Sequence, residues 1–309
     1  MRTKILGLGR HLPPVADARG VSRPIAADPV GPSALAAVAA GQALEAAGRS
    51  VADVDFLVFA TATPDVTFPG AGCYLQDRLG CDTVGALDVR GQCTGFLYGL
   101  MVADQFIRTS TYANILLAGA EVHSSGLDYD GDPETAALFG DGAGVALLGP
   151  GDERGLLAID LHSDGSRYRD FWCEYPASRQ HPVRFTAENL AAGGHFPKLD
   201  RPALQRAGAE QLESAMRRVL AAAGREIEAI DRFVVSHVLP DAACAAAAAL
   251  GIGEANLVVP SQRYGHIMGA ALPLALADEW LDGAVGPGAT VCLAAAGAGE
   301  TWGAAVLEL

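Results

Sequence analysis

The sequence predicts an α/β fold built from two similar halves. Short apolar runs without polar alternation, such as 56–60 (FLVFA) and 233–236 (FVVS), are typical of strands that are covered on both faces. Alanine-rich stretches of helical length alternate with these strands along the chain. An internal repeat is the third observation, because VADVDFLVFATATPD (51–65) resembles IEAIDRFVVSHVLPD (227–241) at an offset of 176 residues. The alternative is a chance likeness of two helix–strand units.

The individual elements follow from the same patterns. We expect strands over 5–8, 56–60, 115–119, 145–148, 233–236 and 290–294, and helices over 33–47, 204–223 and 242–250. Gly48 and Gly224 directly follow two of the helices, as glycine commonly does at helix C-termini. FGDGAGVALLG closes the first half near residue 149, and AAGAGETWGAAVLEL closes the chain in a similar way. These patterns predict one half over 1–154 and a second half over 155–309.

The composition argues against several classes of protein. The 309 residues carry a formal net charge of -14, which disfavours binding to a nucleic acid backbone. No apolar run approaches the roughly 18 residues of a membrane span. The six cysteines are scattered without a C-x-x-C pair, so we expect no metal site. Met1 leads into an expected strand with no signal peptide before it, which predicts reduced thiols and a cytoplasmic location.

One cysteine has a context that suits catalysis. LDVRGQCTGFLYGL (87–100) reads as a strand end, a turn at Gly91, Cys93 and the start of a helix. A thiol at a helix N-terminus feels the positive end of the helix dipole, which lowers its pKa. Gly95 and Gly99 lie four residues apart, so that face of the helix can pack closely against a neighbour. Cys93 is therefore a candidate nucleophile for acyl transfer, although most free cysteines are simply small buried apolar residues.

The chain resembles the thiolase superfamily and, within it, the β-ketoacyl-acyl carrier protein synthase III family. The motifs that carry the resemblance occur in the family's order over nearly the whole length, and they are DVRGQCTGFLYGL, VADQFI, GAEVHSS, LFGDGAGVALL, LHSDGS and ETWGAAVLEL. The resemblance implies a thiolase fold, with two five-stranded mixed sheets stacked as α-β-α-β-α, usually in a homodimer. It also implies a nucleophile at Cys93, no permanently bound cofactor, and acyl-coenzyme A or acyl carrier protein thioesters as substrates.

The resemblance supplies two catalytic partners for Cys93. His237 in FVVSHVLPD matches the family histidine that follows a strand of the second half. His266 in RYGHIMG stands where the family has an asparagine, so the set becomes Cys-His-His, as in elongating ketosynthases. We expect loading of Cys93 to depend on His237 and on backbone donors, which the resemblance places at Cys93 and Ala298. His266 can then donate a hydrogen bond to a malonyl-type thioester or act as a base.

These two roles of His266 leave more than one function open. As a donor, it fits an enzyme that condenses the acyl group of Cys93 with a malonyl-type thioester and releases carbon dioxide. As a base, it fits an acyltransferase that passes the acyl group to an alcohol or amine. A third possibility is a subunit of a heteromeric condensing enzyme. The acyl chain, the acceptor and the pathway are not specified by the sequence.

Other motifs are expected to contact substrate or to be structural. Ala296 replaces a phenylalanine that the family often has near the site, and Phe68 resembles a family residue that caps the partner's acyl pocket. The stretch 17–32 lacks the family tryptophan that grips coenzyme A. It retains Arg19 and Arg23, whose plainer interpretation is a solvated loop. An acidic carrier protein then needs a basic patch, for which Lys198, Arg201 and Arg206 are candidates. His123 in GAEVHSS is either structural or a substrate contact, and Asp141 in GDGAG indicates a tight interior turn.

Overall fold

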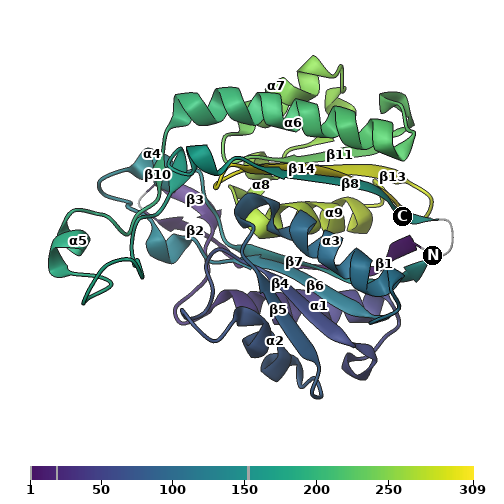
Figure 1. Cartoon of the computed structure of the whole chain (residues 1–309), viewed down its shortest axis with the longest axis horizontal. Coiled ribbons are helices and arrows are strands. Elements are labelled where there is room, and N and C mark those ends of the chain that lie inside the picture. Colours follow the sequence, from purple (N-terminus) through teal and green to yellow (C-terminus); the bar gives the residue numbers. More distant parts are fainter. Residues whose placement is uncertain (1, 19, 152–153) are drawn as a thin grey trace.

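The computed structural model describes residues 2–18, 20–151 and 154–309, which form two stacked five-stranded sheets with helices between and outside them (Figure 1). The strand order is β1-β7-β6-β4-β5 in the first sheet and β8-β14-β13-β11-β12 in the second. The first sheet contains β1 (Arg2–His11), β4 (Phe56–Ala60), β5 (Gly85–Val89), β6 (Ile115–Glu121) and β7 (Gly142–Gly151). The second contains β8 (Gly155–Ser163), β11 (Arg232–Ser236), β12 (Leu257–Val258), β13 (Thr290–Gly297) and β14 (Thr301–Glu308).

The two sheets repeat one pattern of strand directions. β4 runs parallel to β5 and β6, and β11 runs parallel to β12 and β13. β7 and β14 are antiparallel to both of their neighbours. The aspartate directly before β4 and the aspartate directly before β11 make the same kind of contact. Asp55 accepts hydrogen bonds from the backbone N–H groups of Ala113 and Asn114, and Asp231 accepts one from Thr290. The predicted duplication is confirmed.

The helices form three layers around the sheets. The middle layer, between the two sheets, contains α3 (Gly95–Arg108) and α9 (Ala271–Leu281) (Figure 1). The outer face of the first sheet is covered by α1 (Pro32–Ala46) and α2 (Ala71–Leu79), and that of the second by α6 (Arg201–Ala223) and α7 (Pro240–Ala249). This is the α-β-α-β-α stack that the sequence predicts. Both predicted helix ends are also confirmed, because Gly48 and Gly224 have φ values of 61° and 63°.

Small residues let the middle layer pack tightly against the sheets. The face of α3 that carries Gly99 lies so close to Leu117 of β6 that a Cβ at this position would overlap that side chain. A continuous buried core joins α3 and α9 to both sheets, and it includes Val58, Leu117, Leu274 and Leu293. The sheets are thereby fixed relative to one another, and the loops at their strand ends keep a fixed spacing.

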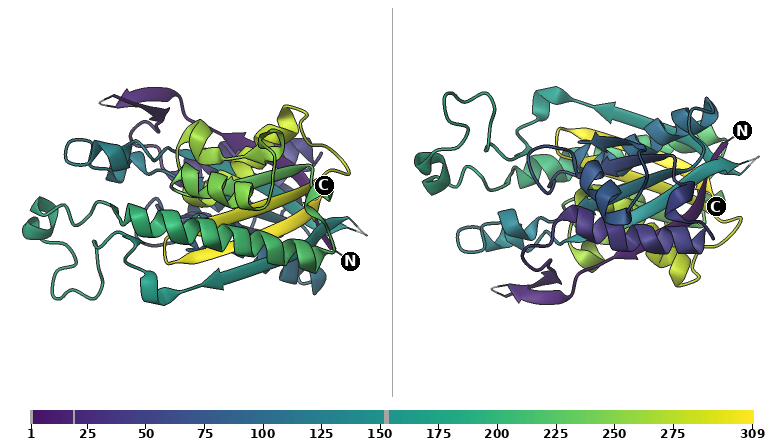
Figure 2. Two further views of the ribbon diagram at one scale, coloured as in Figure 1. Left: turned by 90° about the horizontal axis from the view of Figure 1, so that it is seen from above. Right: turned by 90° about the horizontal axis from the view of Figure 1, so that it is seen from below.

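The remaining elements lie at the end of the molecule away from the chain termini (Figures 1 and 2). They comprise the hairpin β2 (Val15–Ala18) and β3 (Val21–Pro24), the pair β9 (Phe171–Trp172) and β10 (Lys198–Leu199), and two short helices, α4 (Pro133–Ala136) and α5 (Ala187–Ala191). A third short helix, α8 (Pro260–Tyr264), packs against α9 and β11 instead. The expected solvated loop over 17–32 is wrong in part, because its first section belongs to this hairpin. Arg23 Nε donates to the carbonyl oxygen of Ala137 at 3.1 Å, which ties the hairpin to the body.

Candidate active site

Cys93 lies in a tight turn between the first sheet and the middle helix layer. After β5, a single 3-10 turn over Gln92–Thr94 leads directly into α3. Gln92 has a φ of 51°, a left-handed backbone conformation that residues other than glycine rarely adopt. Such backbone strain is typical of functional sites, where it orients a reactive group. The turn presents the Cys93 thiol to the second half of the chain with no solvent exposure.

Burial controls the ionisation of this thiol. Burial, together with the charges of Glu121 and Glu300, raises the pKa of Cys93 to about 12. Hydrogen bonding to the backbone N–H groups of Ala298 and of Cys93 itself works in the opposite direction. The prediction that the pKa of Cys93 is lowered is therefore wrong for this buried thiol. The helix terminus is present, but removal of water from an anion outweighs it. The resting group is a neutral thiol, which needs a base when it attacks.

His266 is placed to be that base. Its Nε2 lies 3.2 Å from Cys93 Sγ, and the whole residue is buried. The backbone of His266 is held by the first half, since its N–H donates to Leu138 and its carbonyl accepts from Gly140. Burial lowers the pKa of His266 well below the usual value, and the charges of His123 and His237 lower it further. A neutral imidazole at neutral pH can accept the thiol proton. The sequence predicts His237 for this step, and the structure places His266 in hydrogen-bonding contact with the thiol.

His237 is held in a single orientation next to this pair. It follows β11 and is 1% exposed, and burial lowers its pKa to about 4. Nδ1 of His237 lies 3.1 Å from both the N–H and the carbonyl oxygen of Leu239, so this backbone segment holds the ring and is compatible with a proton on either ring nitrogen. α6 leaves room for the ring only because residue 208 is glycine, since a Cβ there would overlap Nε2. His237 is therefore a neutral imidazole held in a fixed position.

Two backbone donors meet at the thiol from opposite halves of the fold. Hydrogen bonding from the backbone N–H groups of Cys93 and Ala298 lowers the pKa of the thiol, and their role as an oxyanion hole stays a prediction. Residue 297 has to be glycine, because a Cβ there would overlap the sulfur. The Thr94 and Thr301 hydroxyls lie 2.9 Å apart, and Thr301 Oγ1 donates to the carbonyl of Ala298 at 3.1 Å. This hydroxyl pair fixes the spacing of the two turns.

The structure places the other predicted residues less centrally. Ala296 is fully buried, but it packs in the core beneath α6 and α7 and not in the cluster that contains Cys93. Phe68 is 78% exposed beside the edge of the first sheet. Arg23 is used for the backbone contact described above, and Arg19 lies outside the described residues. Asp141 is fully buried and accepts hydrogen bonds from three backbone N–H groups in two segments, so it is the interior turn that the sequence indicates.

Glu121 and Glu300 were not predicted as parts of the site. The carboxylate of Glu121 accepts hydrogen bonds from Ala62, Thr63 and Gly269 backbone N–H groups, and burial raises its pKa to about 7. Glu300 is 2% exposed and accepts from Gln211 at 2.7 Å. Both are buried acids near a thiol, and their hydrogen-bond partners come from distant segments of the chain.

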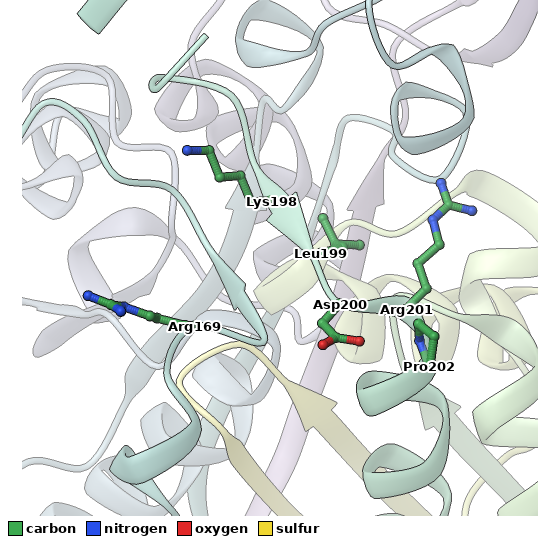
Figure 3. A pocket seen from close by; sticks show the side chains of 6 residues that line it. All are labelled: Arg169, Lys198, Leu199, Asp200, Arg201 and Pro202. Carbon is green, nitrogen blue, oxygen red and sulfur yellow. The ribbon is translucent and has the colours of Figure 1, made fainter. Parts of the chain in front are cut away.

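A basic pocket lies outside the apolar shell of the thiol (Figure 3). It has a volume of about 550 Å³ and is lined by Arg169, Lys198, Leu199, Asp200, Arg201 and Pro202. Leu199 also packs against the apolar cluster that contains Cys93, so the pocket and the site share a wall. Arg201 contacts Thr135 of α4 at 3.2 Å, and Lys198 lies over the Trp172 ring. Arg206 is exposed on α6 outside this lining.

The described part of the chain contains no group of three or more histidine, cysteine or acidic side chains arranged to hold a metal ion. Within the same residues, no helix is both long enough and apolar enough to span a bilayer. All six cysteines are unbridged.

The chain is similar to known proteins over its full length. Family models for 3-oxoacyl-[acyl-carrier-protein] synthase III match residues 87–165 and, for the C-terminal part, residues 220–309. The β-ketoacyl-[acyl-carrier-protein] synthase III of Natranaerobius thermophilus is 35% identical over 290 residues, which are 93% of this chain and 87% of that protein.

Two solved structures of the same enzyme superpose closely. The Pseudomonas aeruginosa enzyme is 30% identical with a TM-score of 0.89, covering 100% of this chain and 98% of that one. The Aquifex aeolicus enzyme is 29% identical with a TM-score of 0.88, covering 99% and 100%. With the motifs around Cys93 and the duplicated sheets, these matches show that the chain belongs to the 3-oxoacyl-[acyl-carrier-protein] synthase III family, also called the β-ketoacyl-acyl carrier protein synthase III family.

Proposed function

We propose that the protein is a condensing acyltransferase, in which Cys93 takes an acyl group from a thioester and joins it to a malonyl-type thioester with loss of carbon dioxide. The observation that carries the proposal is the 3.2 Å contact between Cys93 Sγ and His266 Nε2 beside two backbone donors. A neutral thiol next to a neutral base becomes an active nucleophile when the base takes its proton. Family membership supports acyl transfer between thioesters.

Loading begins when Sγ attacks the acyl carbonyl carbon. The thiol proton passes to His266 Nε2, and the carbonyl oxygen gains negative charge that the N–H groups of Cys93 and Ala298 stabilise. The tetrahedral intermediate then collapses and expels the carrier thiolate, which takes the proton back from His266. The acyl group is left on Cys93, and His266 is neutral again for the next step.

Condensation then uses both histidines as donors. In this step both imidazoles carry their proton on Nε2 and donate to the thioester carbonyl of the malonyl group, so His266 moves its proton from Nδ1 to Nε2 after loading. The carboxylate leaves as carbon dioxide, and its bonding electrons form an enolate whose charge these donors stabilise. The enolate carbon attacks the acyl carbonyl on Cys93, and the Cys93 thiolate leaves and is protonated. In this scheme residues 1–154 supply the nucleophile, and residues 155–309 supply the histidines.

An acyl carrier protein is the better match for the thioester carrier. The hairpin β2–β3 carries no tryptophan, and Arg23 is occupied by a backbone carbonyl, so a coenzyme A nucleotide has few partners there. Arg169, Lys198 and Arg201 instead form a basic pocket against the wall of the site (Figure 3). An acidic carrier protein would dock at such a patch even though the enzyme is acidic overall.

The functional unit in this proposal is a cytoplasmic homodimer. All residues of β5 except Val89 are exposed, so this edge strand can pair with its copy in a second chain. Phe68 is exposed nearby and would extend to the partner's acyl site. The unbridged cysteines fit a reducing compartment. A single species of one chain's mass in light scattering at micromolar concentration would contradict the dimer.

The function is tested by following Cys93 through both steps. We expect intact mass spectrometry to show an acyl adduct after incubation with acyl thioesters, and carbon dioxide to be released when malonyl carrier protein is added. Cys93→Ala should fold normally and load no acyl group. If the wild type loads but transfers only to an alcohol or amine, the non-condensing acyltransferase is correct. If it works only with a second chain present, it is a subunit of a heteromeric enzyme.

A further inference from the structure

A third histidine next to the thiol has no part in the proposed mechanism. His123 follows β6, and its backbone N–H donates to the Asp141 carboxylate at 2.7 Å, which fixes its position. The residue is 8% exposed. Its ring lies 5.1 Å from the ring of Phe139, which in turn lies 6.0 Å from the ring of His266. His123 thus adjoins the reacting groups from the first half of the chain.

The ring nitrogen of His123 is buried without a hydrogen-bond partner among the described residues. Its Nε2 is fully covered, and the nearest charged group, Oε2 of Glu121, is 3.9 Å away, beyond hydrogen-bonding distance. Burial lowers the pKa of His123 to about 4, so the imidazole is neutral at neutral pH. An unpaired buried polar atom costs about 1–3 kcal/mol, and such a cost is retained at a functional site when a ligand supplies the missing partner.

The surroundings of Cys93 indicate what that ligand is. The thiol is fully buried in an apolar cluster that includes Leu127, Ala136, Phe139 and Met268. An acyl group attached to Sγ has to lie among these side chains, because the thiol has no exposed side. Phe139 belongs to this cluster and contacts His123, so His123 is a polar member of an otherwise apolar wall.

We propose that His123 is a specificity-determining residue, and that the acyl group taken by Cys93 carries a hydrogen-bonding substituent, a hydroxyl or oxo group, which pairs with His123 Nε2. The inference rests on the proposed acyl loading of Cys93. A plain alkyl chain of the same length would leave Nε2 unpaired. Sites built to bond a substrate polar group discriminate strongly against the analogue that lacks it. We expect at least about a tenfold preference, because the loss of one buried hydrogen bond is worth about 1–3 kcal/mol.

The test compares two acyl groups on one carrier. 3-Hydroxybutyryl and butyryl pantetheine thioesters compete for Cys93, and intact mass spectrometry measures the ratio of the two adducts. Wild type should favour the hydroxylated group. His123→Leu should abolish or reverse the preference, and His123→Gln, which keeps a hydrogen-bonding group, should retain part of it. His195→Leu is the matched control and should keep the wild-type preference, because His195 Nδ1 is also buried without a partner but its ring packs against Phe185 and Phe196, outside the cluster that contains Cys93.

Stability gives a second, independent readout. His123→Leu removes an unpaired buried polar atom, so its thermal midpoint should equal or exceed that of wild type. If His123→Leu loads Cys93 with the wild-type adduct ratio, or if wild type prefers butyryl, the specificity role is refuted while acyl loading stands. If neither thioester nor any other acyl thioester loads Cys93, the proposed function itself fails.

Discussion

The two halves of the chain enter their middle-layer helices in the same way and use the entries differently. The turn Gln92–Thr94 leads into α3, and the turn Met268–Ala270, 176 residues later, leads into α9. Both turns begin with a residue of positive φ, 51° at Gln92 and 32° at Met268. The duplicated fold therefore provides two equivalent strained turns, of which one carries a cysteine and the other carries Gly269.

The two turns differ in whether the turn or the strand end that it faces carries the larger side chain. Gly269 faces Glu121 at the end of β6, and its N–H donates to that carboxylate at 3.3 Å. Cys93 faces Gly297 at the end of β13, where only a hydrogen atom leaves room for the sulfur. We call the space between each turn and the strand end that it faces a crevice. The crevice at Gly269 is occupied by the Glu121 carboxylate, and the crevice at Gly297 leaves room for the Cys93 thiol. Duplication supplies the scaffold, and a reciprocal exchange of large and small residues decides which copy can perform chemistry.

Adding a side chain at residue 297, next to the Cys93 thiol, should have the largest effect on acyl loading. In Gly297→Ala, the new Cβ overlaps Cys93 Sγ and displaces the thiol from His266 and from the backbone donors. We expect acyl loading to fall by roughly a thousandfold or more, because misplaced reactants and lost oxyanion donors each cost about a hundredfold. The measurement is the single-turnover rate of adduct formation on Cys93.

The matched control makes the same change at the counterpart of Cys93. In Gly269→Ala, the nearest atoms to the new Cβ lie 3.5 Å away, which is an ordinary contact distance. This variant should load acyl groups within a few-fold of wild type. Equal losses in the two variants would show that the two crevices do not differ in the way described.

Replacing His266 should have the next largest effect. In His266→Asn, no neutral base contacts the thiol, so loading depends on the thiolate fraction of a group whose pKa is about 12. We expect loading at pH 7 to fall by about a hundredfold. It should then rise by roughly tenfold per pH unit between 7 and 9, while wild type changes little, since each pH unit below the pKa multiplies the thiolate fraction by about ten.

A histidine outside the site is the control for this substitution. His162 stacks on Trp302 and pairs with Asp160, and no described contact links it to Cys93. His162→Asn should keep the wild-type rate and pH profile. If His266→Asn loads Cys93 normally at pH 7, another group accepts the thiol proton. The result would then favour His237, the residue that the sequence predicts for loading.

Sequence patterns predicted the scaffold better than the site. The offset of 176 residues and the strand pattern were enough for the duplicated sheets, because buried strands and helix ends have local signatures. The motif around Cys93 and the histidines of the second half led to one shared site. The ionisation of Cys93 was predicted wrongly, since a helix terminus is visible in the sequence and complete burial is not. Gly297 and Gly208 were missed because their importance depends on which distant side chain packs against them.

The smallest expected effect on activity, and a clear one on stability, concerns Glu121, the group that fills the second crevice. Burial raises its pKa from 4.5 to about 7, so between these values the folded protein binds a proton that the unfolded chain releases. The free energy of unfolding should therefore fall as pH rises from about 4.5 to about 7, by about 3 kcal/mol, and stay level above.

Glu121→Gln should remove this dependence. The amide cannot ionise, and it also presents donors to the Ala62, Thr63 and Gly269 N–H groups, so we expect a less stable protein at acidic pH. The difference in unfolding free energy between wild type and variant, measured by urea denaturation at pH 5 and pH 8, isolates Glu121 from the other titrating groups. His123 adds its own pH dependence between its folded pKa of about 4 and its usual value of 6.5, but this contribution is common to both proteins and cancels in the difference. Cys93 contributes only above its usual pKa of 9.0, outside the range. The difference should shrink by about 3 kcal/mol from pH 5 to pH 8. A constant difference would mean that Glu121 is charged throughout, and that the second crevice holds a carboxylate stabilised by its donors more strongly than burial opposes it.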